Sequence, residues 1–425
     1  MTRPPRPEDF HIVISNVSKH HAYHMALAAQ QIGSLQALIT SGYLNADGWL
    51  ARLLPSLRRF ESFQRLGDRR SHDLDSRRVH SDWFPECLTY AMRHAPLLTR
   101  GISDYRWMTA KNDLFDRRVS RNLGKCDIFH SFEGCAHVSF KRAKRLGAVT
   151  MLEQPIMHPE TVSETLTREY TQMGLEVPEA YRDSRMVHRK RQEYALADYI
   201  MVPAQAIADD FVAKGVSPSK LRVIPYGASA ERFRREPGKR SKRFRILFVG
   251  TLCIRKGVHY LLEAFKRLSL ADAELVFVGA LDPDIVPILA RYDGEFTYIP
   301  HLPQSELNDW YNRSSVFVLP SLAEGSAYVI YEAMTCGLPV IVTPHCGSVA
   351  RDGEDGFVVA ARNVEALMDR LLWLYEHPER SEEMGVSGMN HVSQFDWIHY
   401  MSRLVETWNE VRELRAANTH RSASP

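Results

Sequence analysis

Short apolar segments alternate along the chain with segments of helical spacing, and this pattern gives the first outline of the fold. It is most regular in the second half, where each apolar run ends at a glycine or a polar loop. The expected strands there are 245–249, 274–278, 296–299, 316–319 and 340–342. The spacing of apolar residues over 258–268 predicts a helix. Strands that are apolar throughout are buried on both faces, which predicts a parallel sheet covered by helices.

The first half follows the same pattern with longer interruptions. Its expected strands are 11–14, 34–39, 127–130, 148–152 and 199–202. Residues 48–122 are expected to be mainly helical and irregular. We therefore predict an α/β protein with one domain at 1–202 and a second at 203–395. A last helix over 396–416 and a disordered tail over 417–425 complete this prediction.

The composition of the 425 residues excludes several classes of protein. Hydrophobic residues make up 44% and charged residues 25%, as in an ordinary globular protein, and the net charge of +3 is low for a dedicated nucleic-acid binder. The six cysteines form no CxxC pair, which excludes a zinc ribbon and favours a reducing compartment. Without a signal-peptide pattern or an apolar stretch of about 18 residues, we expect a cytoplasmic protein.

The first candidate for chemistry is the loop after the strand at 245–249, because open α/β sheets bind ligands beyond the carboxyl ends of their strands. Gly250-Thr251-Leu252-Cys253-Ile254-Arg255-Lys256-Gly257 places two adjacent cations in a turn between glycines. Such a loop suits a phosphate or diphosphate, since backbone N–H groups approach closely at glycine and Lys256 supplies charge. The alternative is an ordinary turn with a solvated Arg–Lys pair. The spacing matches neither a P-loop nor a GxGxxG fingerprint.

The second candidate is the segment after the strand at 316–319, where Glu324 and Glu332 stand eight positions apart. Gly325, Ser326 and Ala327 form the entry to a helix, where N–H groups point outward and the helix dipole favours anions. One element therefore offers an anion site and carboxylates that can accept hydrogen bonds from sugar hydroxyls. The alternative for Glu332 is a surface glutamate in an i,i+4 pair. Its apolar neighbours argue against that, and a buried carboxylate needs a partner.

Four longer segments between 195 and 395 contain these residues and follow one another in a fixed order. They read VPAQAIADDFVAKGVSPSKLRVIPYGASAERF, FVGTLCIRKGVHYLLEAF, EGSAYVIYEAMTCGLPVIVT and GSVARDGEDGFVV. They resemble, in turn, the interdomain segment, the phosphate loop, the E-x7-E signature and the segment after the donor site of glycosyltransferase family 4. Tyr226-Gly227 stands at the usual place in the interdomain segment.

The resemblance implies the GT-B fold, in which two Rossmann-like domains face each other across a cleft and a final helix crosses back to the N-terminal domain. The family retains the anomeric configuration and usually needs no metal or other cofactor. Lys256 would contact the diphosphate of a UDP-, GDP- or ADP-linked sugar, Glu332 the ribose, and Glu324 the transferred sugar. The implied donor site comprises Gly250, Thr251, Arg255, Lys256, Glu324, Gly325, Ser326, Ala327 and Glu332.

Three positions depart from the family's usual residues. Thr251 stands where the phosphate loop often has arginine, and Ser326-Ala327 stand where Phe-Gly is common. Many members carry D-x-x-H-x-H after a strand of the first domain; here Asp127 and His130 are present, and Phe132 occupies the second histidine position. We expect His130 to line the cleft as a catalytic residue, beside Glu324 and Lys256. The alternative is a histidine packed against the core.

A histidine-rich loop follows the first strand. His20 and His24 have the i,i+4 spacing of helical metal ligands, but no HExxH glutamate accompanies them, so we predict no metal site. A polar loop that meets the acceptor is the preferred interpretation. The acceptor-side candidates are His20, His21, His24 and, after another strand, Glu153.

The stretch Trp49–Phe60 mixes arginine with leucine and aromatic residues, within a region (51–150) that holds 20 basic and 11 acidic side chains. It fits a helix resting on an anionic membrane surface, at the inner face of the membrane, which would suit a lipid-linked acceptor. It also fits a core-facing helix with solvated arginines, and Pro55 interrupts the pattern in both cases.

The leading hypothesis is a retaining glycosyltransferase that moves a sugar from a nucleotide-sugar to a glycan or lipid-linked acceptor, in polysaccharide or glycolipid biosynthesis. One alternative keeps the GT-B fold but changes the reaction to that of a nucleotide-sugar epimerase or a phosphorylase. Another is a non-catalytic, nucleotide-sugar-binding partner subunit. The presence of Glu324, Glu332 and Lys256 argues against the last, whereas Thr251 and Phe132 leave room for it.

Overall fold

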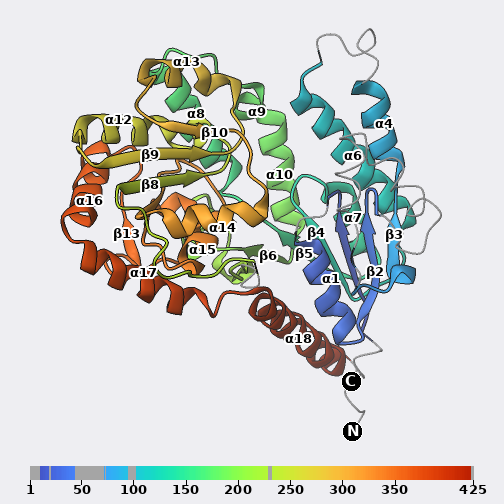
Figure 1. Cartoon of the computed structure of the whole chain (residues 1–425). Helices are drawn as coiled ribbons and strands as arrows, with labels where there is room; N and C mark the ends of the chain where they lie inside the picture. The colour runs from blue at the N-terminus through green and yellow to red at the C-terminus, as the bar shows by residue number, and fades with distance from the viewer. Residues whose placement is uncertain are drawn as a thin grey trace, which may run out of the picture.

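The computed structural model describes residues 10–18, 21–43, 71, 73–93, 102–227 and 232–422, without the side chains of 304, 305 and 416–422. Two α/β units stand side by side, and the last helix runs from the second unit to the first (Figure 1). The stretch 49–60, for which a membrane-surface helix is one expectation, lies outside the described residues.

The first unit is built on seven parallel strands in the order β3-β2-β1-β4-β5-β6-β7. They are β1 (Ile12–Asn16), β2 (Leu35–Thr40), β3 (Val79–Ser81), β4 (Ile128–Phe132), β5 (Val149–Glu153), β6 (Tyr199–Val202) and β7 (Leu221–Val223). All five predicted strands are confirmed, with ends displaced by at most two residues. The sequence does not predict β3 and β7, because they are short, partly exposed strands at the two edges of the sheet and need no long apolar run.

Helices cover this sheet and form the connections between its strands. They are α1 (Ala22–Gln31), α4 (Phe84–Arg93), α6 (Asp104–Asn122), α7 (His137–Arg145), α8 (Pro159–Gln172), α9 (Glu179–Arg182), α10 (Ser184–Leu196) and α11 (Gln205–Ala213). The longest of them, α6, begins at a Ser103 side chain that accepts a hydrogen bond from the N–H of Arg106, a capping arrangement that satisfies a free helix-end donor.

The second unit has six parallel strands in the order β10-β9-β8-β11-β12-β13, the strand order of a Rossmann fold. They are β8 (Phe244–Val249), β9 (Ala273–Val278), β10 (Thr297–Ile299), β11 (Val316–Leu319), β12 (Val340–Val342) and β13 (Gly356–Val358). The five predicted strands are again confirmed. The sixth, β13, is another three-residue edge strand.

The helices of the second unit include the one predicted over 258–268. They are α12 (Val258–Leu268), α13 (Val286–Leu289), α14 (Gln304–Arg313), α15 (Tyr328–Thr335), α16 (Val364–Glu376) and α17 (Pro378–Val392), with the short 3-10 helix η4 (Ile254–Lys256) ahead of α12. The predicted helix and α12 have the same ends. The apolar positions of α12, whose spacing predicts the helix, face the core.

Each unit has its own apolar core, and the last helix, α18 (Trp397–Ser422), belongs to the core of the first. Tyr400, Leu404 and Trp408 are buried there, and Arg415 donates a hydrogen bond to the carbonyl oxygen of Asp127 (2.6 Å). The helix therefore crosses back to the first unit as expected, and it extends beyond the predicted end at 416.

The chain passes between the units at two neighbouring points, one after β7 and one before α18. A Cβ atom on Gly227 would lie 2.2 Å from the carbonyl carbon of Asp396, so only glycine permits the two crossings to touch. The predicted domain boundary at residue 202 lies inside the first sheet, because β6 pairs with β7.

Candidate functional site

The two loops that the sequence singles out in the second unit lie next to each other in the structure. One follows β8 and the other follows β11, and these strands are parallel neighbours at the point where the strand order reverses. Open α/β sheets bind ligands at such a point, beyond the carboxyl ends of the strands. The fold therefore brings the basic turn Gly250–Gly257 to the loop that holds Glu324.

Glu324 forms ion pairs with both cations of the basic turn. Its Oε2 atom lies 2.8 Å from Arg255 Nη1 and 3.3 Å from Lys256 Nζ. Arg255 also donates to the carbonyl oxygen of Ala323 (2.8 Å). The side chains of Arg255, Lys256 and Glu324 remain 23%, 12% and 16% exposed, so solvent or a ligand can reach the cluster.

The electrostatics of this cluster keep Glu324 ionised. Burial alone would raise the pKa of the Glu324 carboxyl, but the positive charges of Arg255 and Lys256 outweigh it and hold that pKa below its ordinary value. Two cations and one carboxylate leave a net positive charge next to a strand end, which suits an anionic ligand.

The glycines of the basic turn are required by close contacts. A Cβ atom on Gly250 would lie 2.9 Å from Lys256 Nζ, and one on Gly257, where φ is 69°, would lie 2.1 Å from the carbonyl oxygen of Pro320. These glycines let the turn fold against its neighbouring loop and let the ammonium group reach Glu324. Thr251, at the position where an arginine is usual, is exposed.

The helix entry at 325–327 is pressed against the first unit. A Cβ atom on Gly325 would lie 1.5 Å from the carbonyl oxygen of Pro155, and Gly325 forms an antiparallel bridge with Ile156. Ser326 Oγ lies 3.0 Å from the hydroxyl of Tyr331, and the N–H of Ala327 donates to the carbonyl oxygen of Cys346 (3.4 Å). The N–H of Ala327, which we expected to point outward, thus already has a partner.

Glu332 lies in α15 and is paired with Tyr311 of α14, a residue that the sequence analysis does not single out. The Tyr311 hydroxyl donates to Glu332 Oε2 at 2.9 Å, and Tyr311 is fully buried between Phe233 and Phe317. Burial raises the pKa of Glu332 to about 7, although the Tyr311 hydrogen bond and the charge of Arg232 lower it. Glu332 is therefore a partly buried carboxyl, as its apolar neighbours predict.

Three of the candidates in the first unit form one cluster. Glu153, at the end of β5, lies 2.8 Å from His21 Nε2 through Oε1 and 3.3 Å from His130 Nε2 through Oε2. The side chains of His21, His130 and Glu153 are only 2%, 0% and 2% exposed. Burial would raise the pKa of Glu153, but the two histidines lower it to about 2.

Aromatic rings enclose this histidine–glutamate cluster. Phe132 lies 5.0 Å and Tyr226 4.4 Å from the ring of His21, and Trp408 of α18 meets His130 edge-on at 6.3 Å. His130, which we expected to line the cleft, is therefore in the core, and the alternative interpretation describes its surroundings. Phe132, at the position of the family's second histidine, is part of the enclosure.

His24, in the first turn of α1, stacks outside this cluster. The ring of His24 stacks on Trp397, with centroids 4.1 Å apart and planes within 3°. His20 lies outside the described residues. Within the part of the chain that the structure describes, no group of three or more His, Cys, Asp or Glu side chains is arranged to hold a metal ion.

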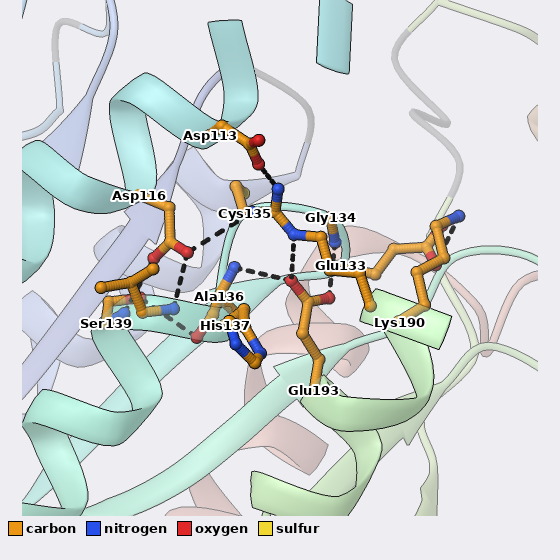
Figure 2. Close-up of polar contacts among 12 residues, drawn as sticks. Asp113, Asp116, Glu133, Gly134, Cys135, Ala136, His137, Ser139, Lys190 and Glu193 are labelled. Carbon is orange, nitrogen blue, oxygen red and sulfur yellow. Dashed lines mark hydrogen bonds and ion pairs between the residues drawn. The ribbon is translucent and has the colours of Figure 1, made fainter. Parts of the chain in front are cut away.

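Buried carboxylates fix the loop after β4, and the sequence analysis does not single them out either (Figure 2). Glu193 of α10 accepts hydrogen bonds from the N–H groups of Gly134 (2.7 Å) and Ala136 (3.1 Å), and Asp116 of α6 accepts from the start of α7. Burial nevertheless raises the pKa of Glu193 to about 7. Arg189 pairs with Asp116, and a cavity of about 310 Å³ lies beside it between α6 and α10.

Comparison with known proteins agrees with this geometry. Residues 243–377 match the family described as glycosyl transferases group 1. A D-inositol 3-phosphate glycosyltransferase from Catenulispora acidiphila is 28% identical over 52% of this chain and 59% of its own length. Another from Paenarthrobacter aurescens is 26% identical over 69% of this chain and 75% of its own length. Sulfoquinovosyl transferase SQD2 of Arabidopsis thaliana is 27% identical, with coverages of 47% and 42%.

The chain spans only part of the length of several of these relatives, such as 59% of the Catenulispora protein. Solved structures, in contrast, match the whole fold. Sucrose-phosphate synthase from Thermosynechococcus elongatus superposes with a TM-score of 0.65 at 18% identity, over 96% of this chain and 100% of that chain. Anabaena HepE, solved in complex with UDP, superposes with a TM-score of 0.62 at 14% identity, over 94% and 100%. At these identities the likeness concerns the fold.

The two Rossmann-like units and the returning helix define the class of fold: the protein has the GT-B fold. The match to the family described as glycosyl transferases group 1 runs over the second unit from β8 to α16. No helix among the described residues is both long enough and apolar enough to span a membrane.

Proposed function

We propose that the protein transfers a sugar, with retention of anomeric configuration, from a nucleoside diphosphate sugar bound in the second unit to a glycan or lipid-linked acceptor. The observation that carries this proposal is the Arg255–Lys256–Glu324 cluster at the switch point of the second sheet. Its cations suit a diphosphate, and its carboxylate suits sugar hydroxyls, so the two parts of one donor would be held side by side.

The chemistry of the transfer follows from where charge develops. The departing nucleoside diphosphate gains negative charge as the glycosidic bond breaks. Lys256 and Arg255 are fixed before the reaction, and preorganised charges of this kind are often worth several kcal/mol in the transition state. In this proposal the diphosphate displaces Glu324 from its cations and leaves that carboxylate free to accept hydrogen bonds from the transferred sugar.

Glu332 would accept hydrogen bonds from the ribose hydroxyls, with Tyr311 holding one of its oxygens. The basic turn of this chain has Thr251 where the family often has arginine, so Arg255 is the second cation available to the diphosphate. The UDP complex of HepE supports a nucleotide ligand, and the name of the inositol-phosphate relatives supports a small phosphorylated acceptor as the first to try.

The test is a thermal-shift and product assay of the purified protein with UDP-, GDP- and ADP-sugars, with EDTA present. A nucleotide-sugar at about 100 times its Kd should stabilise the protein by about 2.7 kcal/mol. We expect one nucleotide to stabilise the protein and its sugar form to release nucleoside diphosphate slowly, with the anomeric configuration of the product read by NMR.

The other outcomes separate the alternatives. Stabilisation without release of diphosphate would favour a non-catalytic binding subunit. Conversion of the sugar without transfer would favour an epimerase, and release that requires inorganic phosphate would favour a phosphorylase. No response to any nucleotide would contradict the proposal.

A further inference from the structure

Helix α8 belongs to the first unit by sequence but is bonded to both units. It starts directly after Pro155–Ile156, the segment that touches Gly325. Its first turns are held by α11 of the first unit: Asp210 accepts from the N–H of His158 (2.7 Å) and from Thr161 Oγ1 (2.6 Å). This end of the helix is therefore fixed to the first sheet.

The second half of α8 is held by the second unit. Glu169 is buried and accepts hydrogen bonds from His259 Nε2 (2.9 Å), the Tyr260 hydroxyl (2.6 Å) and Arg362 Nε (2.7 Å). Arg362 also donates to the carbonyl oxygen of Thr165 (3.0 Å). In Figure 1, α8 accordingly lies among the elements of the second unit, close to α12 and α13.

Apolar and aromatic contacts extend this attachment past the end of the helix. Tyr170 is buried in the core of the second unit, and its hydroxyl donates to Asp284 at 2.9 Å. Met173, Leu175 and Tyr181 pack against the same core. The segment from Thr165 to Tyr181 is thus built into the unit that carries the Arg255–Lys256–Glu324 cluster.

The surroundings of Glu169 favour its ionised form. Burial would raise its pKa, but the hydrogen bonds from His259, Tyr260 and Arg362 lower it to about 2, so the carboxylate stays ionised at all ordinary pH values. His259 and Tyr260 lie in the first turn of α12, directly after the basic turn, where a helix dipole favours a negative charge.

Arg362 adopts a backbone conformation that residues other than glycine rarely take. Its φ of 65° is in the left-handed region, shared among the described non-glycine residues only by Ser269. Such a conformation is unfavourable and persists only when the surroundings enforce it. In this conformation the Arg362 side chain donates to both Glu169 and the carbonyl oxygen of Thr165.

We propose that α8 is a strut that fixes the second unit against the first, and that Glu169 is the positioning residue that anchors it. At about 1.5 Å per residue, a helix of 14 residues spans about 21 Å as one rigid piece. Because both ends of α8 are bonded, the helix fixes the position of Pro155–Ile156 relative to Gly325, which is next to Glu324. The consequence for catalysis rests on the proposed function, whereas the strut itself does not.

The first experiment measures the distance between the units without using activity. Spin labels are placed on cysteines introduced at two exposed positions, Arg121 of α6 and Asp369 of α16, with the exposed Cys87 replaced by serine. In this background we expect Glu169→Ala to give a longer and broader distance distribution by pulsed EPR. An unchanged distribution would overturn the proposal.

Matched variants exclude a trivial loss of fold. Glu176→Ala removes an 84% exposed carboxylate seven positions further along the chain, paired only at the surface with Arg182, and should leave the distribution unchanged. Broadening in that variant too would contradict a specific role for Glu169. Arg362→Ala removes the Glu169–Arg362 bond from the other side and also the bond to Thr165, so combining it with Glu169→Ala should broaden the distribution by less than the sum of the two single changes; fully additive broadening would also overturn the proposal.

The second experiment uses the donor nucleotide. Because the proposed nucleotide contacts all lie in the second unit, Glu169→Ala should change the Kd of UDP, GDP or ADP by no more than about twofold. Transfer should fall by about tenfold to 100-fold in kcat/KM, since small misplacements of reacting groups have effects of that size. Equal losses of affinity and transfer would show local damage to the donor site and reject the strut. If the wild-type protein transfers no sugar, the proposed function fails. The EPR result still decides whether α8 is a strut between the two units.

Discussion

Each unit contains a carboxylate that lies between two basic side chains near the end of a central strand, and the two clusters differ in how far they are enclosed. Glu324 pairs with Arg255 and Lys256, and these side chains keep between 12% and 23% of their surface exposed. Glu153 pairs with His21 and His130, and none of these exceeds 2%. The same arrangement of charge therefore occurs once in reach of a ligand and once inside a core.

The difference shows what each cluster can do. Arg255 and Lys256 can exchange Glu324 for an incoming anion, because water or ligand can replace the lost pairing. His21 and His130 have no such exchange available, since Phe132, Tyr226 and Trp408 close around them. The first cluster is suited to binding, and the second to holding the crossing points of the chain together.

The largest effect that follows from this comparison is on catalysis. Glu324→Ala should lower the rate of sugar transfer by about 10²–10³-fold, the size seen when one preorganised polar group is lost from a transition state. The same change frees Arg255 and Lys256, so binding of the nucleoside diphosphate should be unchanged or tighter. Steady-state kinetics and calorimetry with the nucleotide found in the screen measure the two quantities.

Glu324→Gln serves as the control for shape, because it keeps the size of the side chain and removes its charge. It should resemble the alanine variant in transfer if the carboxylate is the acceptor for sugar hydroxyls. Transfer at the wild-type rate in either variant would remove Glu324 from the catalytic role.

A smaller effect, and one on stability, is expected from the enclosed cluster. Glu153→Ala leaves His21 and His130 buried without their carboxylate; removing one member of a buried pair typically costs about 3–5 kcal/mol, and we expect a loss of about 3 kcal/mol. For a unit of this size, the melting temperature should fall by roughly 2–4 °C per kcal/mol. His24→Ala, which removes a stacked ring outside the cluster, is the comparison and should shift the melting temperature far less. A Glu153→Ala protein as stable as the wild type would show that the cluster does not stabilise the fold.

The sequence predicts the inner strands of both sheets and the positions of the two candidate loops of the second unit, because the information there is local. Strands apolar throughout identify the interior of both sheets, and Lys256, Glu324 and Glu332 each stand at a fixed spacing from such a strand. The edge strands β3, β7 and β13 escape this reasoning, since each has only three residues, although β10, an edge strand of the same length, is predicted.

The remaining features depend on contacts between distant segments, which no local pattern contains. His21 and Glu153 are 132 positions apart, and although each is a candidate by itself, their pairing appears only in the fold. Glu169 lies in a polar helix rich in threonine and glutamate, and it resembles a surface residue until α12 and Arg362 are placed against it. Tyr311 has no signal in the sequence at all, because its function comes from a hydrogen bond to a residue of another helix.

The smallest expected effect concerns Glu332, a third carboxylate, whose hydrogen-bond donor is a neutral tyrosine. The Arg255–Lys256 pair and the two histidines lower the pKa of Glu324 and of Glu153, whereas burial raises that of Glu332 to about 7. If the ionised form accepts the ribose hydroxyls, donor binding is weak below this pKa and strengthens as the pH rises through it. A group with a pKa of 7 is about one tenth ionised at pH 6 and nine tenths at pH 8, so the Kd of the nucleotide should fall by up to about tenfold over that range.

Two variants test whether Glu332 is the source of this pH dependence. Tyr311→Phe removes a hydrogen bond that lowers the pKa of Glu332, so the midpoint of the binding curve should move to higher pH while the affinity at high pH stays the same. Glu332→Gln has no proton to lose and should bind the nucleotide weakly at every pH. A pH profile that survives in Glu332→Gln would assign the titration to another group, and a midpoint unmoved by Tyr311→Phe would show that the tyrosine does not control this carboxyl. Either result would separate Glu332 from the comparison, in which paired basic side chains lower the pKa of Glu324 and of Glu153, whereas Glu332 is paired with a neutral hydroxyl and keeps a raised pKa.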